Sequence, residues 1–226
     1  MKHATLCIGL ALVGLNACVA LLTLVWLPWP PTEMTGGRLA PPSWGHWAGT
    51  DRLGRDYLTQ VMIGARIALT VGIGAATLGG LLGTALGVLA AFARRGLDDA
   101  FAASLDILIA FPTLLLAMLI VAASDGASLG TAILAIGLAM SAIVARLVRI
   151  LTKRVLAQDF VTAARCSGVG WLRIVLAHVL PNILPTVLVA MALQFGLAVI
   201  AEASLSYLGL GAPPPNASWG HLLQQA

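Results

Sequence analysis

The chain has 226 residues, of which 59% are hydrophobic and only 10% are charged, and its net charge is +4. Soluble domains carry about 25% charged residues, so this chain lacks the surface that a water-soluble fold of its size needs. No arginine-rich face interleaved with aromatic residues is present, which excludes nucleic acid as a partner. The composition therefore predicts an all-α, polytopic transmembrane helical bundle whose surroundings are largely lipid.

The first apolar run, Leu6–Leu27, contains no charge. At about 1.5 Å per residue, it is long enough to cross a hydrocarbon core of about 30 Å. A cleaved signal peptide is the alternative, because Lys2 precedes the run and the residues before Cys18 are similar to a lipoprotein cleavage site. The run continues well past Cys18, which favours a retained anchor. Trp26 and Trp29 follow it, where an interfacial aromatic belt is expected.

Pro28–Arg66 is the first long polar segment and is rich in Pro, Gly and Trp. Residues 49–56 read Gly-Thr-Asp-Arg-Leu-Gly-Arg-Asp, and residues 64–69 read Gly-Ala-Arg-Ile-Ala-Leu. By residue type alone, these stretches predict a solvated loop in which Asp and Arg side chains pair locally and cap the next helix.

Four further apolar runs predict membrane spans, which makes five in all: Ile67–Ala93, Ile107–Ala123, Leu129–Ala145 and Ile183–Ala201. Gly79, Gly83 and Gly87 form two small-xxx-small repeats, which predict close helix packing either within this chain or against a partner. Phe111-Pro112 lies near the start of the third run, where a proline is tolerated.

The basic residues predict the orientation of the spans. With the N-terminus in the cytoplasm, nine of the thirteen Lys and Arg residues lie inside: Lys2, Arg94, Arg95, Arg146, Arg149, Lys153, Arg154, Arg165 and Arg173. The other four lie outside, partly balanced by acidic residues: Arg38, Arg52, Arg55 and Arg66. The positive-inside rule therefore favours a cytoplasmic N-terminus, with residues 94–106 and 146–182 inside.

The polar segment 159–182 interrupts the apolar runs and predicts a docking element outside the membrane. Asp159 can cap a short helix over Phe160–Ser167, and Gly168 supplies the left-handed residue that ends it. A second helix follows from Trp171. Pro181 and Pro185 mark the entry into the last apolar run.

Motifs for catalysis and for tight ligand binding are absent from the sequence. There is no Gly-x-x-x-x-Gly-Lys-Ser/Thr run, no His-Glu-x-x-His, no paired-cysteine metal site and no Gly-x-Ser-x-Gly. The cysteines number three, Cys7, Cys18 and Cys166, and predict no disulfide framework. The histidines are isolated, although a transient metal contact at His46 and His221 remains an alternative to ordinary loop histidines.

Three polar residues in or beside the spans are candidates for a pathway or gate. Ser141 and Gln194 could line a pathway or bond a neighbouring helix. Glu202, at the end of the fifth span, is a functional candidate because ionisable groups near a membrane are costly. It could equally anchor the span at the interface.

Segment 159–182 resembles the EAA loop of bacterial ABC-importer permeases, whose pattern is Glu-Ala-Ala, three residues, Gly, then Ile and Leu-Pro. The matching residues are Ala163, Ala164, Gly168, Ile174, Leu180 and Pro181. Thr162 stands where the pattern has Glu. It removes a carboxylate that could pair with an ATPase arginine, a contact worth only about 0–1 kcal/mol.

The two motifs at 49–56 and 64–69 are similar to the signature of the C-type permease of dipeptide, oligopeptide and nickel importers. Residues 205–211 read Leu-Ser-Tyr-Leu-Gly-Leu-Gly and precede Pro213–Pro215 and Ser218-Trp219-Gly220, which that subfamily also has in similar form. The resemblance covers about Gly49 to Gly220. Such permeases have a sixth span after this point, and we expect truncation of the sequence rather than a five-span subunit.

The resemblance implies an ABC type I importer permease fold in the bacterial inner membrane. Residues 1–66 would form the N-terminal transmembrane helix and an extracytoplasmic segment, and residues 67–226 the permease domain with its cytoplasmic loop 146–182. The implied partners are a second homologous permease, two ABC ATPases, an extracytoplasmic solute-binding protein, membrane lipid and a peptide substrate. This chain would bind no cofactor or metal and would not be an enzyme, since ATP and Mg belong to the ATPases.

The resemblance also assigns residues to ATPase coupling: Phe160, Thr162, Ala163, Ala164, Arg165, Gly168 and Pro181. Apolar contact with the ATPase would come from Phe160, Val161, Ala164 and Cys166. The alternative for this helix is an ordinary interfacial position on lipid headgroups. For the whole chain the alternatives are nickel import, an ion-coupled carrier, which needs intramembrane carboxylates or broken helices, and a passive membrane anchor.

Overall fold

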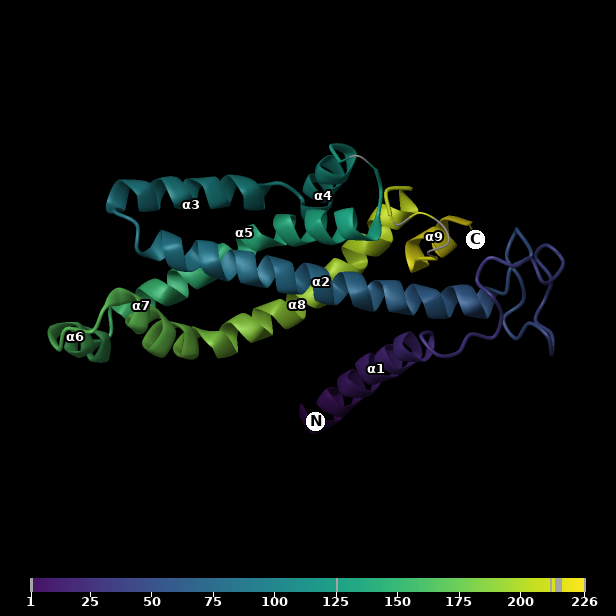
Figure 1. The fold of residues 1–226 in the computed structure, drawn as a ribbon, viewed down its shortest axis with the longest axis horizontal. Helices are drawn as coiled ribbons and strands as arrows, with labels where there is room; N and C mark the ends of the chain where they lie inside the picture. Colours follow the sequence, from purple (N-terminus) through teal and green to yellow (C-terminus); the bar gives the residue numbers. More distant parts are fainter. Residues whose placement is uncertain (1, 125, 212, 214–216, 226) are drawn as a thin grey trace. The chain divides into compact units, whose positions relative to one another are not determined.

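The computed structural model describes the backbone of residues 2–124, 126–211, 213 and 217–225, and their side chains except those of residues 2–6 and 95. The elements in this range are helical apart from one isolated bridge between Thr50 and Asp56 (Figure 1). They are α1 (Lys2–Leu22), α2 (Tyr57–Ala91), α3 (Arg95–Ala110), α4 (Thr113–Ala122), α5 (Leu129–Leu156), α6 (Asp159–Cys166), α7 (Trp171–Ile174), the π-helical turn η1 (Val175–Val179), α8 (Leu180–Tyr207) and α9 (Trp219–Gln225).

The chain forms two compact units. The loop unit consists of Met1–Gly72, Val121–Ala132 and Val199–Ala226. The coupling unit consists of Ile73–Ile120 and Ile133–Ala198, and it contains the docking segment predicted from the sequence.

Among the described residues, three helices are long and apolar enough to cross a membrane: α2, α5 and the continuous helix Trp171–Tyr207, which joins α7, η1 and α8. The pair α3 and α4 makes a fourth if both form one bent span, and Cys7–Leu22 is a shorter apolar helix. The all-α membrane bundle is therefore confirmed. The number of five spans stays a prediction.

The third predicted span, Ile107–Ala123, is not one straight helix. Helices α3 and α4 meet at an angle of 89° (Figure 1). Pro112 has no N–H to donate, and it forces Phe111 into extended backbone (φ −75°, ψ 131°). The expectation that Pro112 lies near the start of one helix is therefore wrong, because this proline separates α3 from α4.

Hydrogen bonds to two aspartates fold the polar loop of the loop unit. Asp51 Oδ1 accepts hydrogen bonds from the backbone N–H groups of Leu53 (2.8 Å) and Arg55 (2.9 Å), and its Oδ2 accepts one from Arg55 Nε (2.7 Å). Asp56 Oδ2 accepts from the backbone N–H of Thr59 at 2.8 Å, as an N-cap does. The prediction of local Asp–Arg pairing and helix capping is confirmed. The cap also explains why α2 begins ten residues before the predicted span.

Two sequence motifs pack on each other in the loop unit. A Cβ on Gly64 would run into the indole ring of Trp219, whose Nε1–H donates to the Val61 carbonyl (3.0 Å). A Cβ on Gly220 would run into the backbone of Ala203. The Gly-Ala-Arg and Ser-Trp-Gly motifs therefore contact each other through Gly64 and Trp219, and Gly220 packs on α8. Pro214 and Pro215, which the sequence comparison also used, lie outside the described residues.

In the coupling unit the three glycines of α2 face the backbone of α5. A Cβ on Gly79 would lie 2.9 Å from the Gly137 carbonyl oxygen, and one on Gly87 would lie 2.5 Å from that of Ala145. Gly83 faces Ser141 between these two contacts. The glycine stripe therefore packs within this chain, which decides between the two alternatives. The contacts advance together along both helices, so α2 and α5 run parallel, and α3 and α4 carry the chain back between them.

An ionic cluster, which we call the Asp98 clamp, joins α3 to the end of α5. Asp98 Oδ1 accepts a hydrogen bond from Arg149 Nε at 2.6 Å, and its Oδ2 contacts Lys153 Nζ. Arg146 and Asp106 add a second, exposed pair at 3.2 Å. The predicted loop 94–106 is therefore mostly helix, and it is fixed to the helix that leads into α6.

We predict that Gly83→Val lowers the stability of the protein. The new side chain would meet the Ser141 carbonyl oxygen at 2.7 Å and Val144 Cβ at 2.6 Å. Such overpacking costs roughly 1–3 kcal/mol. The midpoint of thermal unfolding in detergent measures it. Gly14→Val is the matched control, because a Cβ there meets nothing within 4 Å; equal midpoints for both variants would contradict the packing.

We predict that Asp98→Asn also lowers the unfolding midpoint, since it leaves Arg149 without its buried carboxylate. A hydrogen bond to a charged group contributes about 1.5–3 kcal/mol. Asp99→Asn removes the same charge from an exposed neighbour and serves as the control. Equal unfolding midpoints for both variants would show that the Asp98 clamp does not stabilise the protein.

Candidate functional site

The candidate site is the segment that turns the chain from α5 into α8. Helix α6 begins at Asp159, directly after Gln158, whose backbone is extended (φ −82°, ψ 148°). No side chain caps this end. The prediction that Asp159 is the N-cap is therefore wrong: it is the first helical residue, where its negative charge still faces the positive end of the helix dipole.

Helix α6 ends in a Schellman motif at Gly168. The Gly168 N–H donates to the Arg165 carbonyl (2.9 Å) and the Val169 N–H donates to the Ala164 carbonyl (3.1 Å). Gly168 has φ +80°, while a Cβ there would meet nothing within 4 Å. Backbone conformation, not space, therefore requires glycine, and the predicted left-handed end of the helix is confirmed.

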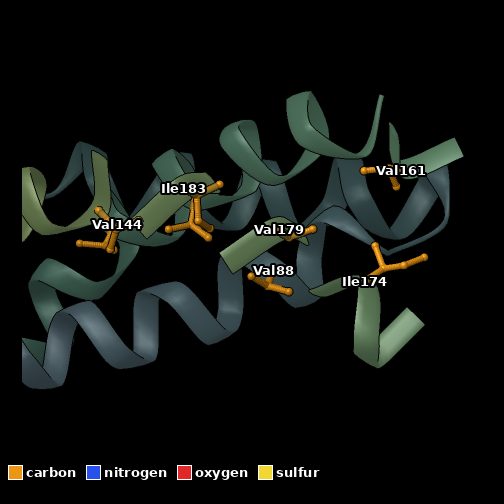
Figure 2. Packing of buried hydrophobic residues seen from close by; sticks show 8 residues of the cluster. Val88, Val144, Val161, Ile174, Val179 and Ile183 are labelled. Carbon is orange, nitrogen blue, oxygen red and sulfur yellow. The ribbon is translucent and has the colours of Figure 1, made fainter. Parts of the chain in front are cut away.

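Val161 holds α6 against the rest of the coupling unit. Its side chain is 1% exposed and belongs to a buried cluster with members from every neighbouring helix. The cluster contains Val88, Val144, Val148, Val161, Ile174, Val179, Ile183 and Val187 (Figure 2). The prediction that Val161 would be free to contact a partner is therefore wrong. It packs instead between its own chain's helices.

Other side chains of α6 and α7 are exposed beside this buried contact. Phe160 and Trp171 are both about half exposed, and Leu172 is 74% exposed. The Arg165 guanidinium lies 4.3 Å from the centre of the Trp171 ring, as in a cation–π pair. Trp171 in turn meets Phe92 edge-on at 5.2 Å. We call Phe160, Arg165, Trp171 and Leu172 the coupling face.

The other residues predicted for coupling differ in exposure and in position. Thr162 and Ala163 are exposed and Ala164 is half-buried. Thr162 makes no side-chain hydrogen bond among the described residues, so the position that usually carries Glu is open to solvent. Pro181 does not break the chain into a new helix, because Trp171–Tyr207 is continuous. The π-helical turn η1 precedes it, and the Leu180 N–H donates to the Val175 carbonyl five residues back.

The three pathway candidates do not share one environment. The Ser141 hydroxyl donates to the Leu138 carbonyl of its own helix (2.7 Å). Gln194 is buried and its Oε1 has no partner among the described groups. Glu202 is buried in the loop unit, where it accepts hydrogen bonds from Ser206 Oγ (2.7 Å) and from Ser218. Glu202 therefore ties the Ser-Trp-Gly segment to α8 rather than anchoring the span at a water interface.

The histidines singled out in the sequence have local partners. His46 Nδ1 lies 3.0 Å from Asp56 Oδ1, and His221 Nε2 lies 2.7 Å from Gln225 Nε2. Within the described part of the chain, no three His, Cys, Asp or Glu side chains come together to hold a metal ion.

Sequence reasoning missed the Asp98 clamp, although the pattern contains a clue to it. Arg146, Arg149 and Lys153 follow one another at spacings of three and four, so they share one face of α5. Asp98 and Asp106 lie eight positions apart, two steps of four, so they also share a face of α3. Their pairing depends on how α3 returns along α5, which the sequence does not show.

Comparison with known proteins shows which family the chain belongs to. Residues 83–226 match the family described as binding-protein-dependent transport system inner membrane component. A Brucella abortus protein, named as a peptide transport system permease, is 40% identical over 100% of this chain and 76% of its own length. A dipeptide transport system permease protein of Alkalihalophilus pseudofirmus is 41% identical over 84% of this chain and 62% of its own length. The chain belongs to the family of binding-protein-dependent transport system inner membrane components, as a multi-pass permease of a transporter complex.

Proposed function

We propose that this chain is a permease subunit of an ATP-driven importer of peptides. The names of its relatives, which refer to peptide and dipeptide transport, support this substrate class over nickel. In this proposal the chain forms half of the translocation pathway. A second homologous permease forms the other half, and an extracytoplasmic solute-binding protein delivers the peptide.

The coupling face carries the proposal. Phe160, Trp171 and Leu172 expose apolar surface on a short helix and the turn that follows it, and such surface suits a groove on another protein better than water. Arg165 adds a positive charge that its contact with Trp171 holds in place. We infer that the partner at this face is a cytoplasmic ABC ATPase. An ATPase of the same kind would bind the second permease.

The buried cluster would convert displacement of α6 into movement of the long helices. Val161 on α6 packs in the same cluster as Val148 on α5 and Ile183 on α8. Close-packed side chains transmit displacement because they leave no void to absorb it. When ATP binding closes the ATPases, the coupling face moves with them, and α5 and α8 follow. ATP and Mg act on the ATPases, and this chain supplies no catalytic group.

The proposed orientation places the coupling face in the cytoplasm. Six of the basic residues predicted to lie inside belong to α5 and to the segment after it: Arg146, Arg149, Lys153, Arg154, Arg165 and Arg173. The parallel packing of α2 and α5 brings the C-terminal ends of both helices to the same side. Residues 94–106, which follow α2, would therefore also be cytoplasmic. With one span before α2, the positive-inside rule would put the N-terminus there as well.

We predict that Gly168→Val uncouples ATP hydrolysis from peptide uptake while the complex still assembles. A β-branched residue at φ +80° is strained by roughly 1–3 kcal/mol, which would distort the Schellman motif and turn the coupling face. ATPase activity and uptake are measured in the same proteoliposomes. We expect uptake to fall at least tenfold more than ATP hydrolysis.

The control is Gly170→Ser, two residues away. Gly170 has φ −68°, and a Cβ there meets nothing within 4 Å, so Ser fits the N-cap of α7. This variant should stay coupled. If Gly168→Val also transports peptide normally for each ATP hydrolysed, the coupling role is wrong.

We predict that a cysteine introduced as Thr162→Cys reacts with a membrane-impermeant maleimide only from the cytoplasmic side. Cys7, Cys18 and Cys166 are exposed and are first replaced by serine. Arg38→Cys, in the exposed polar loop, should react only from the opposite side. Reaction of Thr162→Cys in intact cells would overturn the orientation.

A further inference from the structure

Four of the six tryptophans line one cavity in the loop unit. Trp26 and Trp29 come from the end of the first apolar segment, and Trp44 and Trp47 from the loop that folds back toward it. Pro28, Gly45, Asp56 and Leu58 complete the lining of a cavity of about 250 Å³. The fold therefore gathers aromatic rings that are up to 21 positions apart in the sequence.

Trp29 is held in place by contacts within the loop unit, whereas Trp44 and Trp47 are exposed. The Trp29 Nε1–H donates to the Gly45 carbonyl (2.8 Å), and its ring lies 5.1 Å from that of His46. In contrast, Trp44 is 99% exposed and Trp47 is 67% exposed. Neither of these two indoles has a hydrogen-bond partner among the described residues. Exposed aromatic side chains grouped in this way make the cavity a candidate binding site.

A carboxylate gives this site a negative charge. Asp56 Oδ2 accepts hydrogen bonds from the Thr59 backbone and hydroxyl, and Oδ1 accepts one from His46 Nδ1. The Asp56 side chain is only 2% exposed, so its charge acts on the cavity through space rather than through a free acceptor position. None of the described residues that line the cavity is Lys or Arg, and the arginine next to Asp56 in sequence, Arg55, is paired with Asp51. Aromatic faces beside a carboxylate attract an ammonium ion.

The position of the cavity identifies the source of the ammonium. Trp26 directly follows Leu24 and Val25, two exposed apolar residues just after the end of α1. Trp at such a position lies at the level of the lipid headgroups. A volume of 250 Å³ is also below the about 300–1,000 Å³ of sites for drug-sized ligands, so it suits a headgroup better than a peptide.

We propose that the tryptophan cavity binds the ammonium headgroup of a phospholipid, phosphatidylethanolamine or phosphatidylcholine, in the leaflet where α1 ends. Trp44 and Trp47 contact the ammonium, Asp56 attracts it, and the phosphate stays at the open rim. The site fixes the loop unit to the bilayer surface. This inference does not depend on which peptide the transporter carries or on the orientation of the chain.

The test is native mass spectrometry of the detergent-purified chain, together with the subunits that copurify with it, after delipidation. Phosphatidylethanolamine and phosphatidylglycerol with the same acyl chains are offered in equal amounts. We expect retention of phosphatidylethanolamine over phosphatidylglycerol by roughly fivefold, and loss of this preference in Trp44→Ala/Trp47→Ala. Trp44→Phe/Trp47→Phe should keep part of it, because the aromatic faces remain.

Met34→Ala is the control, since Met34 is an exposed apolar residue of the same loop and does not line the cavity; it should leave the preference unchanged. An unchanged circular dichroism spectrum shows that a variant is folded. We expect unchanged spectra, because the indoles of Trp44 and Trp47 are exposed. Equal retention of the two lipids by the unmodified chain, or an unchanged preference in the double alanine variant, would overturn the proposal. Displacement of phosphatidylethanolamine by dialanine at millimolar concentration would overturn it too, because the site would then take a peptide amino group.

Discussion

The burial of Val161 is the contact on which the coupling unit depends. Helix α6 has eight residues, too few for a stable isolated helix, which needs about 12–15. Full burial of a valine contributes roughly 1.5–3 kcal/mol, and the Schellman motif at Gly168 ends the helix without leaving its last carbonyls unpaired. The helix therefore exists because the chain's own core holds it. The same attachment leaves Phe160, Trp171 and Leu172 free to meet another protein.

Glycine and short polar side chains serve different purposes in the two units. In the coupling unit, Gly79 and its repeats let two long helices touch backbone to backbone, and close approach replaces the hydrophobic effect that lipid does not supply. In the loop unit, Asp51 and Asp56 bind backbone N–H groups and shape a polar loop that has little apolar core. The glycines therefore serve helix packing in one unit, and the carboxylates serve loop folding and helix capping in the other.

The coupling segment was largely predictable because its signals are local. A glycine with positive φ and a helix of about two turns follow from residue type, and both are present. Residue type does not show which side of α6 is buried, so the sequence pattern wrongly assigns Val161 to the surface that contacts a partner. The break at Phe111-Pro112 was missed for a related reason: a proline in the first turn of a helix and a proline that separates two helices have the same sequence signature.

The sequence by itself determined the class of protein, since a chain with 10% charged residues can be covered only by lipid. It also determined the capped loop and the left-handed helix end at Gly168, because these depend on neighbours in the chain. The tertiary structure decided the Asp98 clamp, the contact between Gly64 and Trp219, and the gathering of four tryptophans around Asp56. Those features join residues many positions apart, and their partners are set by how helices pack, which periodicity and residue type do not encode.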